Sequence, residues 1–156
     1  MVKSYDIFKK EIRIINEDFN INSLYKNVRG KIDELRYVYL EKKQTTKPKK
    51  YGQEIKFEIS LSKEVDDFCV NEINIEMFFE NINKPKSHDH GDARILVKAK
   101  QTFDYKNRWG MSKFNMWLFK IYLLVKKLEF EEKYTVPIIN DATQIYNLIK
   151  ESLGAT

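Results

Sequence analysis

The sequence predicts one α+β domain over residues 1–156, in which an antiparallel sheet of about four to five strands packs its helices on one face. Three observations support this fold class. Apolar and polar residues alternate in several segments of the middle third of the chain. Helix-period patterns stand before and after that third, and the connections between successive strands are short, as in an antiparallel meander.

The chain begins with a predicted edge strand and a helix. Phe8, Ile12 and Ile14 share one parity of an extended segment, although a helix through residues 7–15 is an alternative. A helix then follows from the spacing of its apolar residues by four, four and three positions, which places them on one face: Leu24, Val28, Ile32 and Leu35. Asn22 is the predicted N-cap of this helix.

Alternation with a period of two begins after Arg36, and a basic, turn-like segment is predicted for residues 42–52. The strongest strand patterns lie at residues 55–61, 73–79 and 95–103. One face of each of these strands is apolar and the other is charged, so one face of the sheet is expected to be buried and the other exposed to solvent. A loop over residues 81–92 separates the second and third of these strands and contains both histidines.

The last third is predicted to be helical. Ser112 can cap a helix that runs through Val125, and apolar residues cover nearly its whole circumference. Such a helix is normally buried on more than one side. Pro137 permits a new helix start, and Gly154 suits the position after a helix end.

Composition excludes several classes of protein. With 42% hydrophobic and 33% charged residues, the chain matches neither a disordered segment nor a membrane-spanning bundle. The single cysteine excludes an internal disulfide and a cysteine zinc site, and Cys69 is predicted to be a buried thiol. The start of the chain has no signal-peptide pattern, and the apolar run 114–125 is too short to span a bilayer, so a cytoplasmic protein is expected.

The residues from Phe103 to Trp109 carry an Asp-Tyr-x-x-x-Trp motif at Asp104, Tyr105 and Trp109. With Ser112 and Phe114 they resemble an uncharacterised family of small archaeal α+β proteins, in which a long strand ends in this motif before a Ser-capped turn and a hydrophobic helix. The resemblance implies the same order of strands and helices. It implies no activity, because the function of that family is unknown.

Few residues indicate catalysis. The chain has no nucleophile elbow and no glycine-rich phosphate loop, so we expect a non-enzymatic protein without a cofactor. His88, His90 and Asp92 form the one cluster with the residue types of a metal site, and Glu72 or Asp104 are possible distant donors. The alternative is a polar turn, and a metal-dependent enzyme built on this loop is the third functional hypothesis.

The charge distribution indicates more than any motif. Residues 42–56 have a net charge of +5 and residues 98–127 of +7, so the remainder must contribute −7 to the total of +5. Basic segments interleaved with aromatics favour binding to RNA or a ribonucleoprotein surface. The residues predicted to make this contact are Lys47, Lys49, Lys50, Lys98, Lys100, Lys106, Arg108, Trp109, Lys113, Lys120 and Lys127.

Three alternatives remain for the same residues. Peripheral docking on anionic lipid through region 105–127 would insert Trp109, Trp117 and Phe119 among the headgroups. A protein partner or a second copy of the chain could cover the apolar helix at 114–125. In the third alternative the lysines only solvate the surface while the aromatics fill the core.

Overall fold

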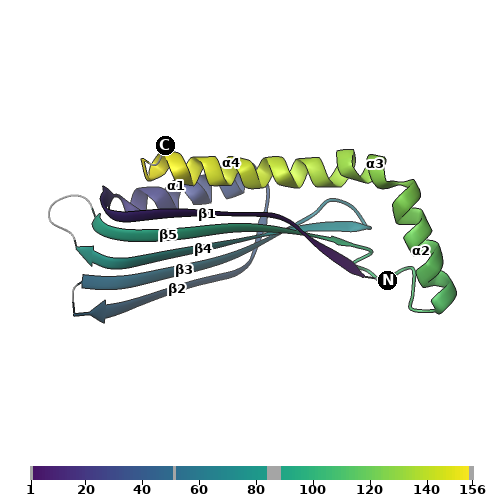
Figure 1. Cartoon of the computed structure of the whole chain (residues 1–156), viewed down its shortest axis with the longest axis horizontal. Helices are drawn as coiled ribbons and strands as arrows, with labels where there is room; N and C mark the ends of the chain where they lie inside the picture. The colour runs from purple at the N-terminus through teal and green to yellow at the C-terminus, as the bar shows by residue number, and fades with distance from the viewer. Residues whose placement is uncertain (1, 51, 84–88, 155–156) are drawn as a thin grey trace.

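The computed structural model describes residues 2–50, 52–83 and 89–154 of the chain. Five antiparallel strands form a single sheet in the order β1-β5-β4-β3-β2 (Figure 1). The strands are β1 (Lys3–Phe19), β2 (Val38–Lys49), β3 (Gly52–Glu64), β4 (Cys69–Asn83) and β5 (Asp89–Phe103). The predicted fold class is confirmed, and β1 is an edge strand as expected.

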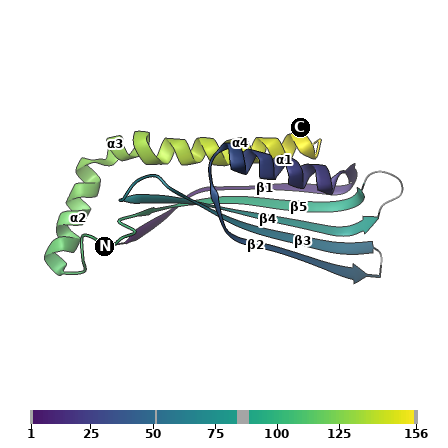
Figure 2. The ribbon, with the colours of Figure 1, turned by 180° about the vertical axis from the view of Figure 1, so that it is seen from behind.

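The helices lie on one side of this sheet and beyond one of its ends (Figure 2). They are α1 (Ile21–Glu34), α2 (Lys113–Val125), α3 (Lys127–Phe130), the π-helical turn η1 (Glu131–Thr135) and α4 (Val136–Ser152). In both views α1 and α4 run along one face of the sheet. Helix α2 lies at an angle to the shared direction of α3 and α4 and stands past the end of the sheet.

The main core lies between the sheet and the pair α1 and α4. Leu24, Val28 and Ile32 of α1 are buried, which confirms the apolar face predicted for this helix. Helix α4 contributes its own buried face of Ile138, Ala142, Ile145 and Ile149. These side chains pack on the inward residues of β3, β4 and β5. The opposite face of the sheet is mainly polar, although Phe78 and Leu96 lie on it beside Lys56, Glu76 and Arg94.

Two bulges interrupt the pairing of β1 with β5. Asp6 pairs with Lys100 and Phe8 with Ala99, so Ile7 is an extra residue on the edge strand. A second shift between Ile14 and Glu17 leaves Ile15 76% exposed. Each bulge reverses the in–out parity of the strand, which is why one alternating pattern cannot describe all of β1.

Two local sequence predictions are corrected. The N-cap of α1 is Asn20 rather than Asn22, because the side chain of Asn20 accepts a hydrogen bond from the Ser23 amide at 2.9 Å. The buried carboxylate of Asp89 also accepts the Ile21 amide at this helix end. The segment predicted as turn-like at residues 42–52 is mainly the edge strand β2, which runs to Lys49. Its lysines suit an exposed edge because they oppose pairing with another chain.

The C-terminal helices follow the sequence closely. Ser112 caps α2 by accepting the Asn115 amide at 3.1 Å, as predicted. As predicted, a helix starts at Pro137: α4 begins at Val136, has Pro137 in its first turn and follows η1 directly. Since proline has no amide hydrogen, it interrupts the α-helical hydrogen-bond ladder at the point where the π turn accommodates the extra residue. Gly154, with a φ of 70°, ends α4 as expected.

Candidate functional site

A second, smaller core holds α2 against the end of the sheet. Its buried members are Cys69, Phe103, Phe119, Phe130 and Tyr134. Phe68 lies among them, with its ring 5.5 Å from that of Phe103 and 5.4 Å from that of Phe130. This aromatic cluster uses only the inner side of α2, where Phe119, Tyr122 and Leu123 are found.

The outer side of α2 is apolar and exposed. We call it the α2 apolar face, and with Leu128 of the adjoining α3 its members are between 38% and 77% exposed: Phe114, Trp117, Ile121, Leu124, Val125 and Leu128. Phe114, Trp117, Ile121 and Leu124 are spaced by three and four residues in turn, the spacing that keeps side chains on one side of a helix. The sequence had predicted burial on more than one side. Within the described residues α2 is covered on its inner side alone, because the sheet ends before it can cover the other.

Three cations border this face. Lys113, Lys120 and Lys127 recur every seven residues, as the sequence indicated, and we call them the lysine stripe. Within the part of the chain that the structure describes, none of the three forms an ion pair with an acidic side chain. Residues 105–128 contain no Asp or Glu, so no acidic side chain of this segment opposes the stripe.

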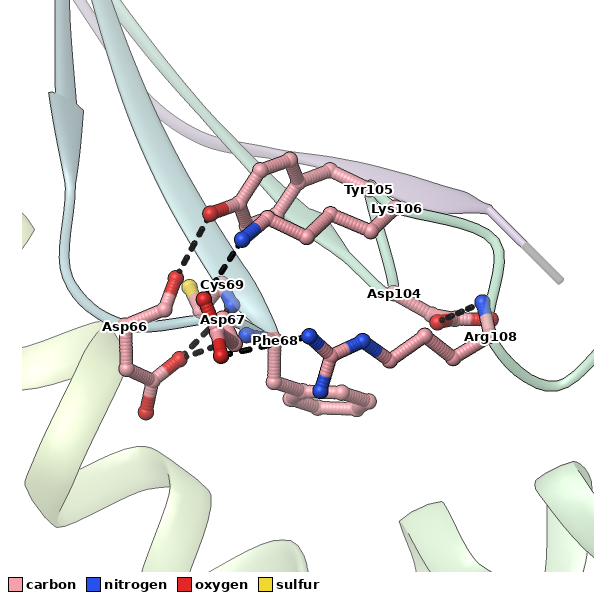
Figure 3. Close-up of polar contacts among 8 residues, drawn as sticks. All are labelled: Asp66, Asp67, Phe68, Cys69, Asp104, Tyr105, Lys106 and Arg108. Carbon is pink, nitrogen blue, oxygen red and sulfur yellow. Dashed lines mark hydrogen bonds and ion pairs between the residues drawn. The ribbon is translucent and has the colours of Figure 1, made fainter.

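The loop between β3 and β4 fixes the aromatic cluster through Asp66 (Figure 3). The Asp66 carboxylate accepts hydrogen bonds from the amides of Phe68 and Cys69, at 2.8 and 2.9 Å. It also accepts the Tyr134 hydroxyl at 2.6 Å and pairs with Lys133 at 3.1 Å. Burial opposes ionisation of Asp66, but these donors outweigh it and lower the pKa of the carboxyl to about 2.

The Asp-Tyr-x-x-x-Trp motif serves this junction. Figure 3 shows Tyr105 donating its hydroxyl to the Asp66 carbonyl, while Asp67 pairs with Lys106 and Arg108. The Asp104 carboxylate accepts the amides of Arg108 and Trp109, and Trp109 packs on Phe119 and Tyr122. Lys106 and Arg108, both predicted to bind nucleic acid, are therefore paired with Asp67, and Trp109 is packed. Lys49, another predicted contact, pairs with Glu54 at 3.3 Å.

The remaining predicted cations lie elsewhere. Lys47, Lys49 and Lys50 are at the far tip of the β2–β3 hairpin, separated from α2 by the length of β3, about 40 Å at 3.3 Å per residue. Lys98 and Lys100 lie on the open face of β5, where Lys100 is 4.0 Å from Glu72. Lys113 and Lys120 lie on α2 and Lys127 begins α3, apart from the other predicted lysines.

The predicted metal residues are engaged in other contacts. His90 contacts Asp18 and Asn16 through its two ring nitrogens. Asp92 accepts hydrogen bonds from the Asn16 amide and the Asn81 side chain. His88 lies outside the described residues, and among those that are described no three His, Cys, Asp or Glu side chains form a metal-ligating group. Glu72 lies near Lys100, and Asp104 follows the opposite end of β5 from His90.

Comparison with known proteins gives no assignment. No protein-family model matches the chain, and no curated protein matches it. The resemblance to small archaeal proteins therefore stays a prediction. Among the described residues, every helix is either too short or too polar to cross a membrane.

Proposed function

We propose that the chain is a peripheral membrane-associated protein that docks on anionic lipid through the α2 apolar face and the lysine stripe. The observation that carries the proposal is the exposure of Phe114, Trp117 and Leu128 beside cations that have no acidic partner among the described residues. An interfacial helix uses this combination, in which apolar side chains enter the headgroup region and lysines contact lipid phosphates.

The position of α2 supports the proposal. The helix stands at one end of the molecule, past the end of the sheet (Figure 1). Its inner side is fixed by the aromatic cluster, so the outer side can meet a flat surface without unfolding of the domain. Tryptophan and phenylalanine are suited to the boundary between water and hydrocarbon, and here Trp117 lies 6.1 Å from Phe114, ring centre to ring centre.

A second copy of the chain fits this face less well. Two α2 helices packed antiparallel through their apolar faces would bring the lysine stripes opposite each other, because flanking positions of the same type meet in that arrangement. Like charges at such positions are destabilising. A surface that presents many negative charges would instead attract these lysines.

Binding to vesicles tests the proposal. The protein should sediment with phosphatidylcholine vesicles that contain phosphatidylserine and not with phosphatidylcholine alone, and its tryptophan emission should shift to the blue. Replacing Lys113, Lys120 and Lys127 by glutamine should reduce binding about 100-fold, because each lysine near an anionic surface contributes about 1 kcal/mol.

The matched control is the triple glutamine variant of Lys47, Lys49 and Lys50. It loses the same charge from the opposite end of the sheet, so vesicle binding should stay close to that of the parent protein. Equal losses in the two variants, or equal binding to neutral vesicles, would contradict docking through α2. The RNA hypothesis predicts a different result, in which the control variant loses salt-sensitive retention on RNA.

A further inference from the structure

A groove opens beside α2, at the end of the sheet. Its volume is about 630 Å³, and it lies between the first residues of β1, the last residues of β5 and the junction of α2 with α3. Its apolar lining comes from Tyr5, Ile7, Phe103, Leu123, Leu124 and Phe130. We call it the end groove. Its volume lies in the range of sites that bind small molecules.

Two features of the fold create the end groove. The bulge at Ile7 changes the direction of the edge strand where it leaves the main core. The chain also changes direction at Lys126, between α2 and α3, so α4 covers the middle of the sheet while α2 stands beyond its end (Figure 2). The strand segment from Lys3 to Ile7 thus borders an open space.

The buried polar residue of the groove is already hydrogen-bonded. Gln101 is 1% exposed, and its amide oxygen accepts the Thr135 hydroxyl at 3.0 Å. Its amide nitrogen donates to the Asn71 side chain at 3.3 Å. Because these polar groups have partners, a hydrocarbon chain could occupy the groove without leaving them unpaired.

The charges on the rim of the groove indicate the charge of the ligand. Lys3, Lys120 and Lys127 line the groove, against Asp6 and Glu131, which gives a net charge of +1. Lys120 and Lys127 lie together on the helical side with Leu123 and Leu124. An apolar groove with two lysines on one wall fits a hydrocarbon chain that carries an anionic head.

The end groove is continuous with the α2 apolar face. Leu124 belongs to both surfaces, and it is 74% exposed. Lys120 and Lys127 belong both to the lysine stripe and to the groove rim. A lipid that meets the docked helix would therefore find the groove next to it.

We propose that the end groove binds one acyl chain of an anionic monoacyl lipid, with the head held by Lys120 and Lys127. This inference rests on the proposed membrane docking, which would supply the lipid. Along β1 the groove extends over residues 3–7, about 13 Å, which accommodates an extended chain of about ten to twelve carbons.

Laurate, kept below its micelle concentration, is the probe because it tests the groove in the absence of any membrane. Isothermal titration calorimetry of the full chain should give saturable binding with one laurate per protein. Lys120→Glu should weaken laurate binding at least tenfold, since the exposed side chain changes from attracting to repelling the carboxylate. Circular dichroism should show that this variant keeps its fold.

Lys113→Glu is the matched control. It removes the same charge from the same helix and the same stripe, but Lys113 does not line the groove. We expect its laurate affinity to stay within twofold of the parent protein, whereas both variants should lose affinity for anionic vesicles.

The two proposals can fail separately. Absence of laurate binding, equal binding by Lys120→Glu, or equal affinity for uncharged monolauroylglycerol would overturn the groove site while leaving vesicle docking intact. Laurate binding that depends on Lys120 without any binding to vesicles would support the groove and refute the membrane as its source.

Discussion

Replacing Asp66 by asparagine should destabilise the protein in a manner that depends on pH. One carboxylate oxygen of Asp66 accepts the amides of Phe68 and Cys69, and the other accepts the Tyr134 hydroxyl and pairs with Lys133. Asparagine can keep the first oxygen in place. Its amino group then replaces the second oxygen and offers hydrogens where an acceptor is needed.

The magnitude follows from the pKa of Asp66. The folded protein lowers that pKa from an ordinary value of 3.8 to about 2, and the side chain is 30% exposed. A difference of one between the pKa values of the folded and unfolded states corresponds to about 1.4 kcal/mol. Ionised Asp66 therefore contributes about 2 kcal/mol to the free energy of unfolding at neutral pH. We expect Asp66→Asn to lose this amount.

The pH dependence has a definite sign. Because the folded-state pKa is below the unfolded value, the contribution is complete above about pH 4 and is lost as the pH falls towards about 2. Urea unfolding followed by circular dichroism, at pH values from about 7 to about 2, should show the parent protein and Asp66→Asn converging at the acid end.

Asp67→Asn is the neighbouring control. Asp67 pairs with Lys106 and Arg108 at the surface, where ion pairs contribute little, so this variant should unfold at nearly the same urea concentration as the parent. A stability difference for Asp66→Asn that is the same at neutral and acid pH would refute the reasoning, because it would show that the carboxylate charge is not the source of the stabilisation.

Two further predictions concern the two cores. Phe79→Ala should lower the free energy of unfolding by about 3–5 kcal/mol, measured by urea denaturation, because this fully buried ring contacts Phe19 and Phe57 in the main core. Cys69 should resist alkylation by iodoacetamide at neutral pH until the protein unfolds, since burial, with the charge of Asp66 nearby, raises the pKa of its thiol to about 12. Rapid alkylation of the native protein, detected by mass spectrometry, would contradict that burial.

The alternating patterns of β3, β4 and β5 were sufficient to predict the sheet, because a strand buried on one face has a period of two regardless of its neighbours. The same holds for the apolar face of α1 and for the Ser112 cap. These features depend on residues close together in the chain. The register of β1 depends on its pairing with β5, which shifts by one residue at the Ile7 bulge. The sequence pattern therefore predicted which side chains of β1 are buried only in part.

The α2 apolar face and the lysine stripe were likewise predictable from the sequence only in part. Its members were visible in the sequence as a helix apolar on nearly all sides, bordered by lysines at every seventh residue. That composition could not tell which side would be covered. The structure places the aromatic cluster under Phe119 and Tyr122 and leaves Trp117 exposed, because the sheet ends at Phe103.

The sequence by itself determined the α+β class, the strongest strands and the concentration of positive charge in two segments. Only the tertiary structure decided that these two segments lie at opposite ends of the sheet and that Asp67 pairs with Lys106 and Arg108. It also decided that Lys3 and Tyr5 of β1 border the same groove as Lys120 of α2. The physical reason is that periodicity and capping are local, whereas the pairing of charges and the covering of an apolar face depend on segments that only folding brings together.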